Sequence, residues 1–207
     1  MYSLTSSISK DTQHIVLIDD DHSVRQGLEL MLTNLGYMVH SYSDATDFLN
    51  RGFEATPCIM VCDMNMPHLS GVEVQAALAS QGRADMPIIF ISGQSSVEQS
   101  ITAMKQGAVE FLIKPFNVND LLKAIEQGFA LVEKMHQNAL KKHALENQLK
   151  KLSPREREVF HLLAMGYNNT EILNKLDISL PTTKQYKSEV MRKLNLNSLS
   201  ELIALQH

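Results

Sequence analysis

Polar side chains stand directly after four short apolar runs of the chain. They are Asp19 with Asp20, Asp63, Ser92 and Lys114, which follow the runs 14–18, 58–62, 87–91 and 109–113. Short runs without alternation are typical of strands buried on both faces of a parallel sheet. The carboxyl ends of such strands share one edge, where ligands bind. We therefore expect three carboxylates, a hydroxyl and an ammonium group to meet there.

This set of groups indicates phosphoryl chemistry. Neighbouring carboxylates repel one another, and a hard cation such as Mg²⁺ relieves the repulsion while keeping water positions open for phosphate oxygens. Lys114 suits one phosphoryl oxygen as a compact charge, and Ser92 can donate a hydrogen bond to another. Asp63 is the predicted acceptor of the phosphoryl group, because Asp19 and Asp20 form a metal-binding pair. Each residue alone would indicate only a cap or a turn.

The segments between the apolar runs have helical patterns. An apolar stripe ends at Gly36, which is expected just past a helix, and a helix over about 95–106 is expected to stop at Gly107. Capping boxes are predicted at Asp44 with Asp47 and at Ser70 with Glu73. Five strands alternating with five helices predict an α/β fold with a doubly wound parallel sheet.

These motifs resemble the receiver domain of bacterial response regulators. The resemblance covers about residues 13–130 and rests on IVLIDDD, DMNMPHLSG, ISG and FLIKPF, which begin at residues 15, 63, 91 and 111. It implies a flavodoxin-like fold and an acyl phosphate on Asp63 that is taken from a sensor histidine kinase and hydrolysed slowly. It also implies Mg²⁺ held by Asp20, Asp63 and the backbone carbonyl of Asn65, with Asp19 acting through water.

The same resemblance implies a cis Lys114-Pro115 bond and a conformational switch. In this switch Ser92 turns towards the phosphoryl group and Phe111 swings inward. Phe111 has this role by position alone, and a core aromatic on the fifth strand is an equal alternative. A phosphatase of the haloacid dehalogenase type also uses an Asp after a strand. That class needs a second acid two residues on, where this chain has Asn65.

A connector without proline follows the fifth strand and its helix. Residues 121–152 are dominated by strong helix formers, which predicts one long helix. Its residues at coiled-coil spacing are Leu131, Met135, Asn138, Lys142, Leu145, Leu149 and Leu152. Dimerisation through this stripe and a solvated linker helix both explain the pattern. We expect a flexible leader over 1–12, a first domain over 13–130, a helical linker over 131–152 and a second domain over 153–207.

Four short helices are predicted in the second domain. A capping box at Ser153 and Glu156, with proline between them, begins the first helix. The second and third are expected over about 170–176 and 180–194, and Ser179 is the N-cap of the third. Two helices joined by a tight turn are typical of a helix-turn-helix, which binds DNA.

The third of these helices carries polar residues that could contact DNA. Thr183, Val190 and Leu194 are expected on its buried side. The amino-terminal half of a recognition helix reads bases in the major groove, where Lys can contact guanine and Gln adenine. The candidate contacts are Thr182, Lys184, Gln185, Lys187, Ser188, Arg192 and Lys193, with the amides near Asn169 as a phosphate site. A solvated polar face is the alternative.

The segment 152–205 resembles the LuxR-type domain of the NarL/FixJ class of regulators. The resemblance rests on LSPREREV from residue 152 and on Gly166, Asn169, Ile172, Leu176, Ile178, Ser179, Thr182, Lys184, Met191, Lys193 and Leu194. The chain departs from the family pattern at Thr183, Tyr186, Glu189 and Leu173, where Val, His, Asn and Ala are usual. Glu189 puts a negative charge near DNA phosphates, and Leu173 crowds the packing. We therefore expect weak binding by a monomer and pairing of two domains on an inverted repeat.

Composition sets further limits on the class of protein. The net charge is −4, but residues 1–149 carry 10 Lys/Arg and 17 Asp/Glu, whereas residues 150–207 carry 9 and 6. This asymmetry predicts different partners for the two ends. Cys58 and Cys62 lie in one buried strand and are expected to be reduced core residues. We find no membrane-spanning run and no signal peptide, and therefore expect a cytoplasmic protein.

The combined prediction is a two-component response regulator that controls transcription. Phosphorylation of Asp63 would bias a two-state receiver, and a surface around the fifth strand would then favour homodimers. Dimers would place two recognition helices on double-stranded promoter DNA, with RNA polymerase as a further candidate partner. No enzymatic activity beyond slow self-dephosphorylation is expected. Tyr186 and Glu189 keep open the alternative that the second domain binds a protein.

Overall fold

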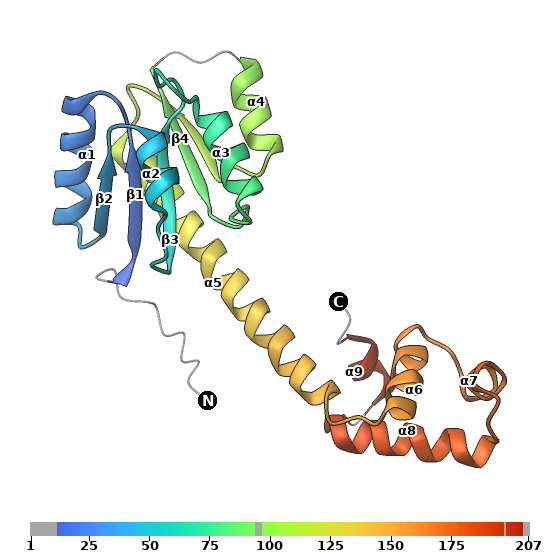
Figure 1. Ribbon diagram of the computed structural model, residues 1–207. Helices are drawn as coiled ribbons and strands as arrows, with labels where there is room; N and C mark the ends of the chain where they lie inside the picture. Colours follow the sequence, from blue (N-terminus) through green and yellow to red (C-terminus); the bar gives the residue numbers. More distant parts are fainter. Residues whose placement is uncertain (1–11, 94–96, 197, 205–207) are drawn as a thin grey trace. The chain divides into compact units, whose positions relative to one another are not determined.

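The computed structural model describes residues 12–93, 97–196 and 198–204, and its chain divides into two compact units between His136 and Gln137. The first unit is built on a parallel sheet with the strand order β2-β1-β3-β4-β5 (Figure 1). Its strands are β1 His14–Ile18, β2 Met38–Tyr42, β3 Cys58–Asp63, β4 Ile88–Ser92 and β5 Glu110–Ile113. This confirms the doubly wound α/β fold predicted from the sequence.

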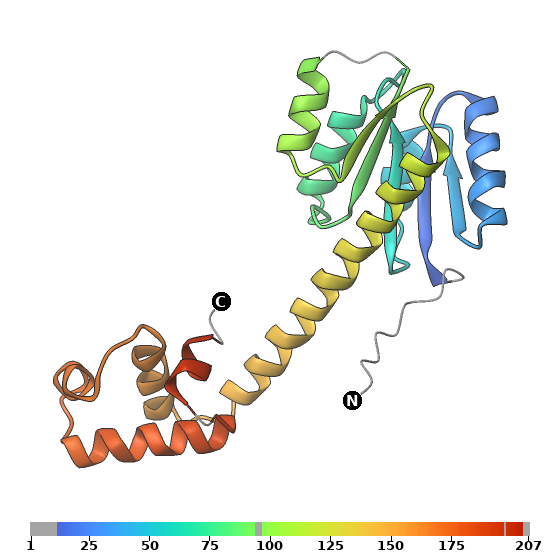
Figure 2. The same ribbon diagram turned by 180° about the vertical axis from the view of Figure 1, so that it is seen from behind.

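Helices cover both faces of the sheet. They are α1 His22–Asn34, α2 Ala45–Arg51, α3 Gly71–Ser80, α4 Val97–Lys105 and α5 Val118–Leu149. The first turns of α5 lie with α1 against one face, and α2, α3 and α4 lie against the other (Figures 1 and 2). The start of the fourth helix that we expected near Ser95 lies outside the described residues, as do residues 1–11 of the leader that we expected over 1–12.

The two apolar layers explain the unbroken hydrophobic character of the strands. Along β1, Val16 and Ile18 pack towards α2 and α3, whereas Ile15 and Leu17 pack towards α1 and α5. All four side chains are fully buried. A strand buried on both faces has no solvent side that could carry polar residues, so alternation is lost.

Local signals set the starts of most helices, with one error in our prediction. The Ser70–Glu73 capping box is present. The box at Asp44 and Asp47 is wrong: Asp44 accepts a hydrogen bond from the Thr46 amide, and Asp47 forms an ion pair with Arg51 at 2.7 Å. The shorter Asp side chain does not reach back to the N-cap amide as Glu does.

The second unit is a small helical domain. It contains α6 Pro154–Ala164, α7 Asn169–Leu176, α8 Leu180–Leu194 and α9 Leu199–Ala204. The predicted capping box at Ser153 and Glu156 and the N-cap at Ser179 are both present. Phe160, Val190 and their apolar neighbours form its core. Among the helices of the described residues, none combines the length and apolar character needed to cross a bilayer.

Candidate functional site

The sheet brings the predicted acids together at its carboxyl edge. β1 and β3 are hydrogen-bonded neighbours. Asp19, which follows β1, and Asp63, the last residue of β3, therefore stand at adjacent strand ends where the strand order reverses. Asp19 is 0% exposed and Asp63 is 7% exposed, whereas Asp20 is open to solvent. One carboxylate oxygen from each of these three residues lies within 4.8 Å of the others. This donor set and its spacing are compatible with a divalent cation.

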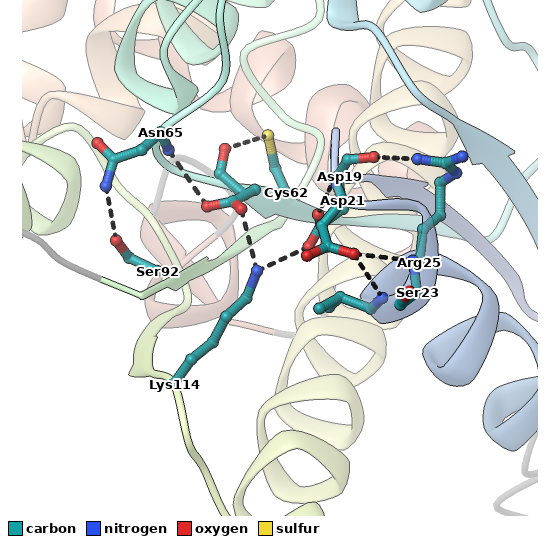
Figure 3. Close-up of polar contacts among 10 residues, drawn as sticks. Asp19, Asp21, Ser23, Arg25, Cys62, Asn65, Ser92 and Lys114 are labelled. Carbon is teal, nitrogen blue, oxygen red and sulfur yellow. Dashed lines mark hydrogen bonds and ion pairs between the residues drawn. The ribbon is translucent and has the colours of Figure 1, made fainter.

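Lys114 joins two of the acids. Its Nζ donates hydrogen bonds to Asp19 Oδ2 at 2.8 Å and to Asp63 Oδ2 at 3.0 Å (Figure 3). The residue follows β5, and its peptide bond to Pro115 is cis, as the family resemblance implied. The ammonium group therefore lies beside Asp63, where its charge could also attract an anionic group.

Burial and pairing oppose each other in this cluster. Burial raises the pKa of Asp19, and the hydrogen bond and charge of Lys114 offset only part of that effect. Burial alone would lower the pKa of Lys114, but its hydrogen bonds and charge interactions with Asp19 and Asp63 raise that pKa above its ordinary value. The carboxylates therefore hold more negative charge than one lysine neutralises, and they would gain from an added cation.

Two residues that we did not predict support Asp19. The Asp21 backbone N–H donates to Asp19 Oδ1 at 2.9 Å, and the Asp21 side chain caps α1 by accepting from the amides of Ser23 and Val24. Arg25 Nη1 donates to the Asp19 carbonyl at 2.6 Å (Figure 3). The N-cap pattern at Asp21 could have been recognised in the sequence. The hydrogen bond from Arg25 to the Asp19 carbonyl depends on the rotamer of the arginine, and no pattern in the sequence indicates it.

The loop after β3 connects the predicted acceptor to Ser92. The Asn65 backbone N–H donates to Asp63 Oδ1 at 3.2 Å, and the Asn65 side-chain Nδ2 donates to Ser92 Oγ at 3.0 Å. Ser92 is fully buried at the end of β4. The structure thus places Ser92 and Asn65 with the acids, and it adds a contact between the two side chains that the sequence did not indicate.

Phe111 lies on β5 beside the core. Its half-buried ring packs against the layer that contains α3 and α4, and its centroid lies 6.5 Å from that of Phe90. It is therefore a partly buried aromatic next to the strand that ends at Ser92. Cys62 is buried in the same layer, and burial raises the pKa of its thiol.

The polar face of α8 is the second candidate site. Thr183, Val190 and Leu194 are buried, as predicted. The other candidate contacts are all accessible: Lys184, Gln185, Ser188 and Arg192 are exposed, and Thr182, Lys187, Lys193 and Asn169 are half-buried. Tyr186, one departure from the family pattern, is half-buried and packs against the core of the domain.

Two cations of α8 already have acidic partners that sequence reasoning missed. Arg192 Nη2 lies 2.7 Å from Oε2 of Glu189, which stands three residues earlier on the same helix. Lys193 Nζ lies 2.7 Å from an oxygen of Glu156, which is only 6% exposed. The hydrogen bond from Lys193 is the main reason that the pKa of Glu156 is lowered. The i, i+3 spacing could have indicated the first pair, whereas the second joins residues 37 positions apart.

Comparisons with known proteins agree with this arrangement. The family model of the response regulator receiver domain matches residues 15–126, and that of the bacterial regulatory proteins of the luxR family matches residues 150–206. Response regulator protein TmoT of Ectopseudomonas mendocina is 34% identical over 189 residues, which cover 91% of this chain and 86% of TmoT. Transcriptional regulatory protein FixJ of Bradyrhizobium diazoefficiens is 35% identical over 93% of each chain.

Solved structures show the same two-part organisation. Response regulator StyR superimposes with a TM-score of 0.72 at 36% identity, covering 94% of this chain and 98% of that chain. Full-length FixJ from B. japonicum superimposes with a TM-score of 0.57 at 36% identity, covering 93% and 94%. The alternative of a phosphatase is therefore wrong, because both parts of the chain match regulators. The chain belongs to the NarL/FixJ class of two-component response regulators, with a receiver domain followed by a LuxR-type DNA-binding domain.

Proposed function

We propose that Asp63 accepts a phosphoryl group from a sensor histidine kinase and that the acyl phosphate switches DNA binding. The observation that carries this proposal is the contact of Lys114 with Asp63, whose side chain is 10% exposed, beside two further acids. Lys114 can move from Asp63 Oδ2 to a phosphoryl oxygen without leaving the pocket. Ser92, on the neighbouring strand, supplies a hydroxyl for a second oxygen.

The acids suit Mg²⁺ as the cofactor of this transfer. Asp20, Asp63 and the backbone carbonyl of Asn65 would hold the ion, and Asp19 would act through water. When bound, the ion neutralises charge on the phosphoryl oxygens. The chain itself contributes position: Asp21 and Arg25 fix Asp19, and the Asn65 amide fixes Asp63. Slow hydrolysis of the acyl phosphate would then return the receiver to its resting state.

The surface next to β5 is our candidate for dimerisation. Ile101 and Met104 on α4 are 48% and 44% exposed, and Ile113 on β5 is 62% exposed. Exposed apolar side chains on adjacent elements mark interaction sites. In the proposed switch Ser92 and Phe111 move with the phosphoryl group, and this neighbouring surface pairs two receivers. If the resting state dominates by about 99 to 1, reversing it requires ~5.5 kcal/mol.

Paired receivers would bring two α8 helices to an inverted repeat in promoter DNA, and RNA polymerase is a further proposed partner. Lys184, Gln185 and Ser188 are exposed near the amino-terminal half of α8, the part of a recognition helix that reaches base edges. Because the chromosome is the proposed target, we place the protein in the cytoplasm.

The test measures promoter binding and oligomeric state with and without beryllofluoride and Mg²⁺. Wild type should bind more tightly and dimerise on addition, and Asp63→Asn should not respond. Asp47→Asn removes the same charge from α2 and should respond like wild type. Equal binding under all conditions would refute the phospho-switch. Absence of binding to any genomic fragment would favour a protein-binding second domain.

A further inference from the structure

The side chain of Asn65 ties the phosphoryl-acceptor loop to the switch hydroxyl. Asn65 Nδ2, in the loop after β3, donates to Ser92 Oγ at the end of β4 at 3.0 Å, although the two residues are 27 positions apart in sequence (Figure 3). Its backbone N–H donates at the same time to Asp63 Oδ1 at 3.2 Å. The backbone of Asn65, which carries this side-chain amide, is therefore held by Asp63, the residue that the proposed function phosphorylates.

This hydrogen bond involves Ser92 Oγ, the atom that changes position in the proposed switch. In the proposed function Ser92 turns so that its hydroxyl reaches a phosphoryl oxygen on Asp63. Ser92 is fully buried, so water cannot readily replace a lost hydrogen bond at its Oγ. Rotation of Ser92 therefore breaks this hydrogen bond, and the amide of Asn65, which is an exposed residue, must then find an acceptor in water or in a group of the pocket.

Phosphorylation itself would provide that acceptor. A phosphoryl group on Asp63 adds anionic oxygens next to the Asn65 amide, and hydrogen bonds to charged acceptors are about twice as strong as those between neutral groups. The side-chain N–H of Asn65 would then exchange the neutral Ser92 hydroxyl for a phosphoryl oxygen.

We propose that the Asn65 side chain is a latch that holds Ser92 in its resting position until Asp63 is phosphorylated. Asn65 is a positioning residue in this role, separate from the metal contact of its backbone carbonyl. The proposal rests on the proposed phospho-switch and deepens it by naming what restrains the switch beforehand. Loss of one neutral hydrogen bond shifts an equilibrium constant by roughly two- to twelvefold, which is the expected rise in the ratio of active to resting receivers.

The experiment compares isoleucine methyl NMR spectra of the full-length chain, because Ile91 precedes Ser92 and Ile113 lies on β5. The shifts in free protein and in protein saturated with beryllofluoride and Mg²⁺ define the two states. Asn65→Ala keeps the backbone amide and carbonyl and removes the side-chain amide that donates to Ser92. The methyl shifts of the free variant should move towards the activated values by an amount that corresponds to a roughly two- to twelvefold rise in the ratio of active to resting receivers. The shifts of His68→Ala, an exposed control in the same loop, should stay at the wild-type values.

A double-mutant cycle separates the latch from other effects of the substitution. In a Ser92→Ala background the acceptor is absent, so adding Asn65→Ala should leave the free spectrum unchanged. An equal shift in both backgrounds, or no shift in either, would overturn the latch while leaving the phospho-switch standing. If beryllofluoride and Mg²⁺ move no methyl signal of the wild type, the proposed switch is wrong and the latch falls with it.

Discussion

The acidic residue on α8 should weaken DNA binding by engaging an arginine. Glu189 Oε2 accepts from Arg192 Nη2 at 2.7 Å and from Nε at 3.2 Å, so the guanidinium is held by the neighbouring turn. Both side chains are accessible, with exposures of 68% for Arg192 and 38% for Glu189. Glu189→Gln keeps the shape of the side chain and removes its charge. We expect this change to release Arg192 to a DNA phosphate.

The size of the effect follows from the exposure of the pair. An exposed ion pair shifts an equilibrium by at most about fivefold, so we expect a gain in affinity of roughly two- to fivefold per subunit. Each phosphate newly contacted also changes the slope of log affinity against log salt by about −0.9. A dimer with two released arginines should therefore show a slope steeper by ~2, and its gain should shrink as salt rises.

The assay is fluorescence anisotropy on a promoter fragment at salt concentrations between ~50 and ~200 mM. Glu158→Gln is a matched control, because Glu158 pairs with Arg155 on α6 at the same spacing and at 2.7 Å. An equal gain from Glu158→Gln would refute the reasoning, since net charge alone would then explain the result. Tighter binding to random DNA with loss at the promoter would instead indicate that Glu189 accepts from a cytosine amine.

Other substitutions test the pocket, the packing and the titration of the receiver. Lys114→Met should lower the free energy of unfolding at pH 7 by about 2 kcal/mol, less than for a fully buried pair. Urea titrations should show recovery in Mg²⁺ and also as the pH falls, because the raised pKa of Asp19 lets its uncompensated carboxylate become neutral. Gly71→Ala places a Cβ 2.7 Å from Phe90 and should destabilise by ~1–3 kcal/mol, whereas Gly27→Ala, with nothing within 4 Å, should stabilise by ~0.5–1 kcal/mol in the same titration. Burial lowers the pKa of His40, so protonation of the unfolded chain below pH 6.5 should reduce stability, and His40→Gln should flatten the fall in melting temperature between pH 7 and pH 5.

The arrangement at the sheet edge could be predicted because topology determines it. Once the strands are parallel and their crossovers right-handed, residues that follow them must share one edge, whatever their side-chain rotamers. Asp19, Asp63, Ser92 and Lys114 needed only that rule. Compared with the predicted runs 58–62, 87–91 and 109–113, β3 and β4 each extend one residue further, to Asp63 and Ser92, and β5 begins one residue later, at Glu110. Asp63 and Ser92 still stand at the carboxyl ends of their strands.

Contacts between distant side chains could not be predicted in the same way. The bond from Asn65 to Ser92 depends on a rotamer and on how the β3–α3 loop packs, and neither is encoded in apolar periodicity. The failed capping box at Asp47 shows the same limit within one helix turn, since a single methylene decides whether the side chain reaches the amide. Sequence patterns thus placed the backbone well and long-range polar contacts poorly.

The departures from the LuxR-type pattern have different meanings once burial is known. Tyr186 packs against the core, so its presence is a packing feature and carries little weight against DNA binding. Thr183 is fully buried, and its hydroxyl donates to the Ser179 carbonyl at 3.1 Å, which satisfies its polar group. Glu189 is the departure among these that changes charge on the accessible side of α8.

Acidic partners hold the key cations in both domains, but burial decides which cations can be released. In the proposed phosphoryl transfer, Lys114 would exchange a carboxylate for a phosphoryl oxygen that arises within the same pocket. Arg192 is mostly exposed, so leaving Glu189 costs little. Lys193 differs, since moving to DNA would leave the Glu156 carboxylate, which is only 6% exposed, without its cationic partner and with the Ser153 amide as its remaining hydrogen-bond donor. Of the two candidate phosphate contacts at the end of α8, we therefore expect Arg192 to reach DNA and Lys193 to remain with Glu156.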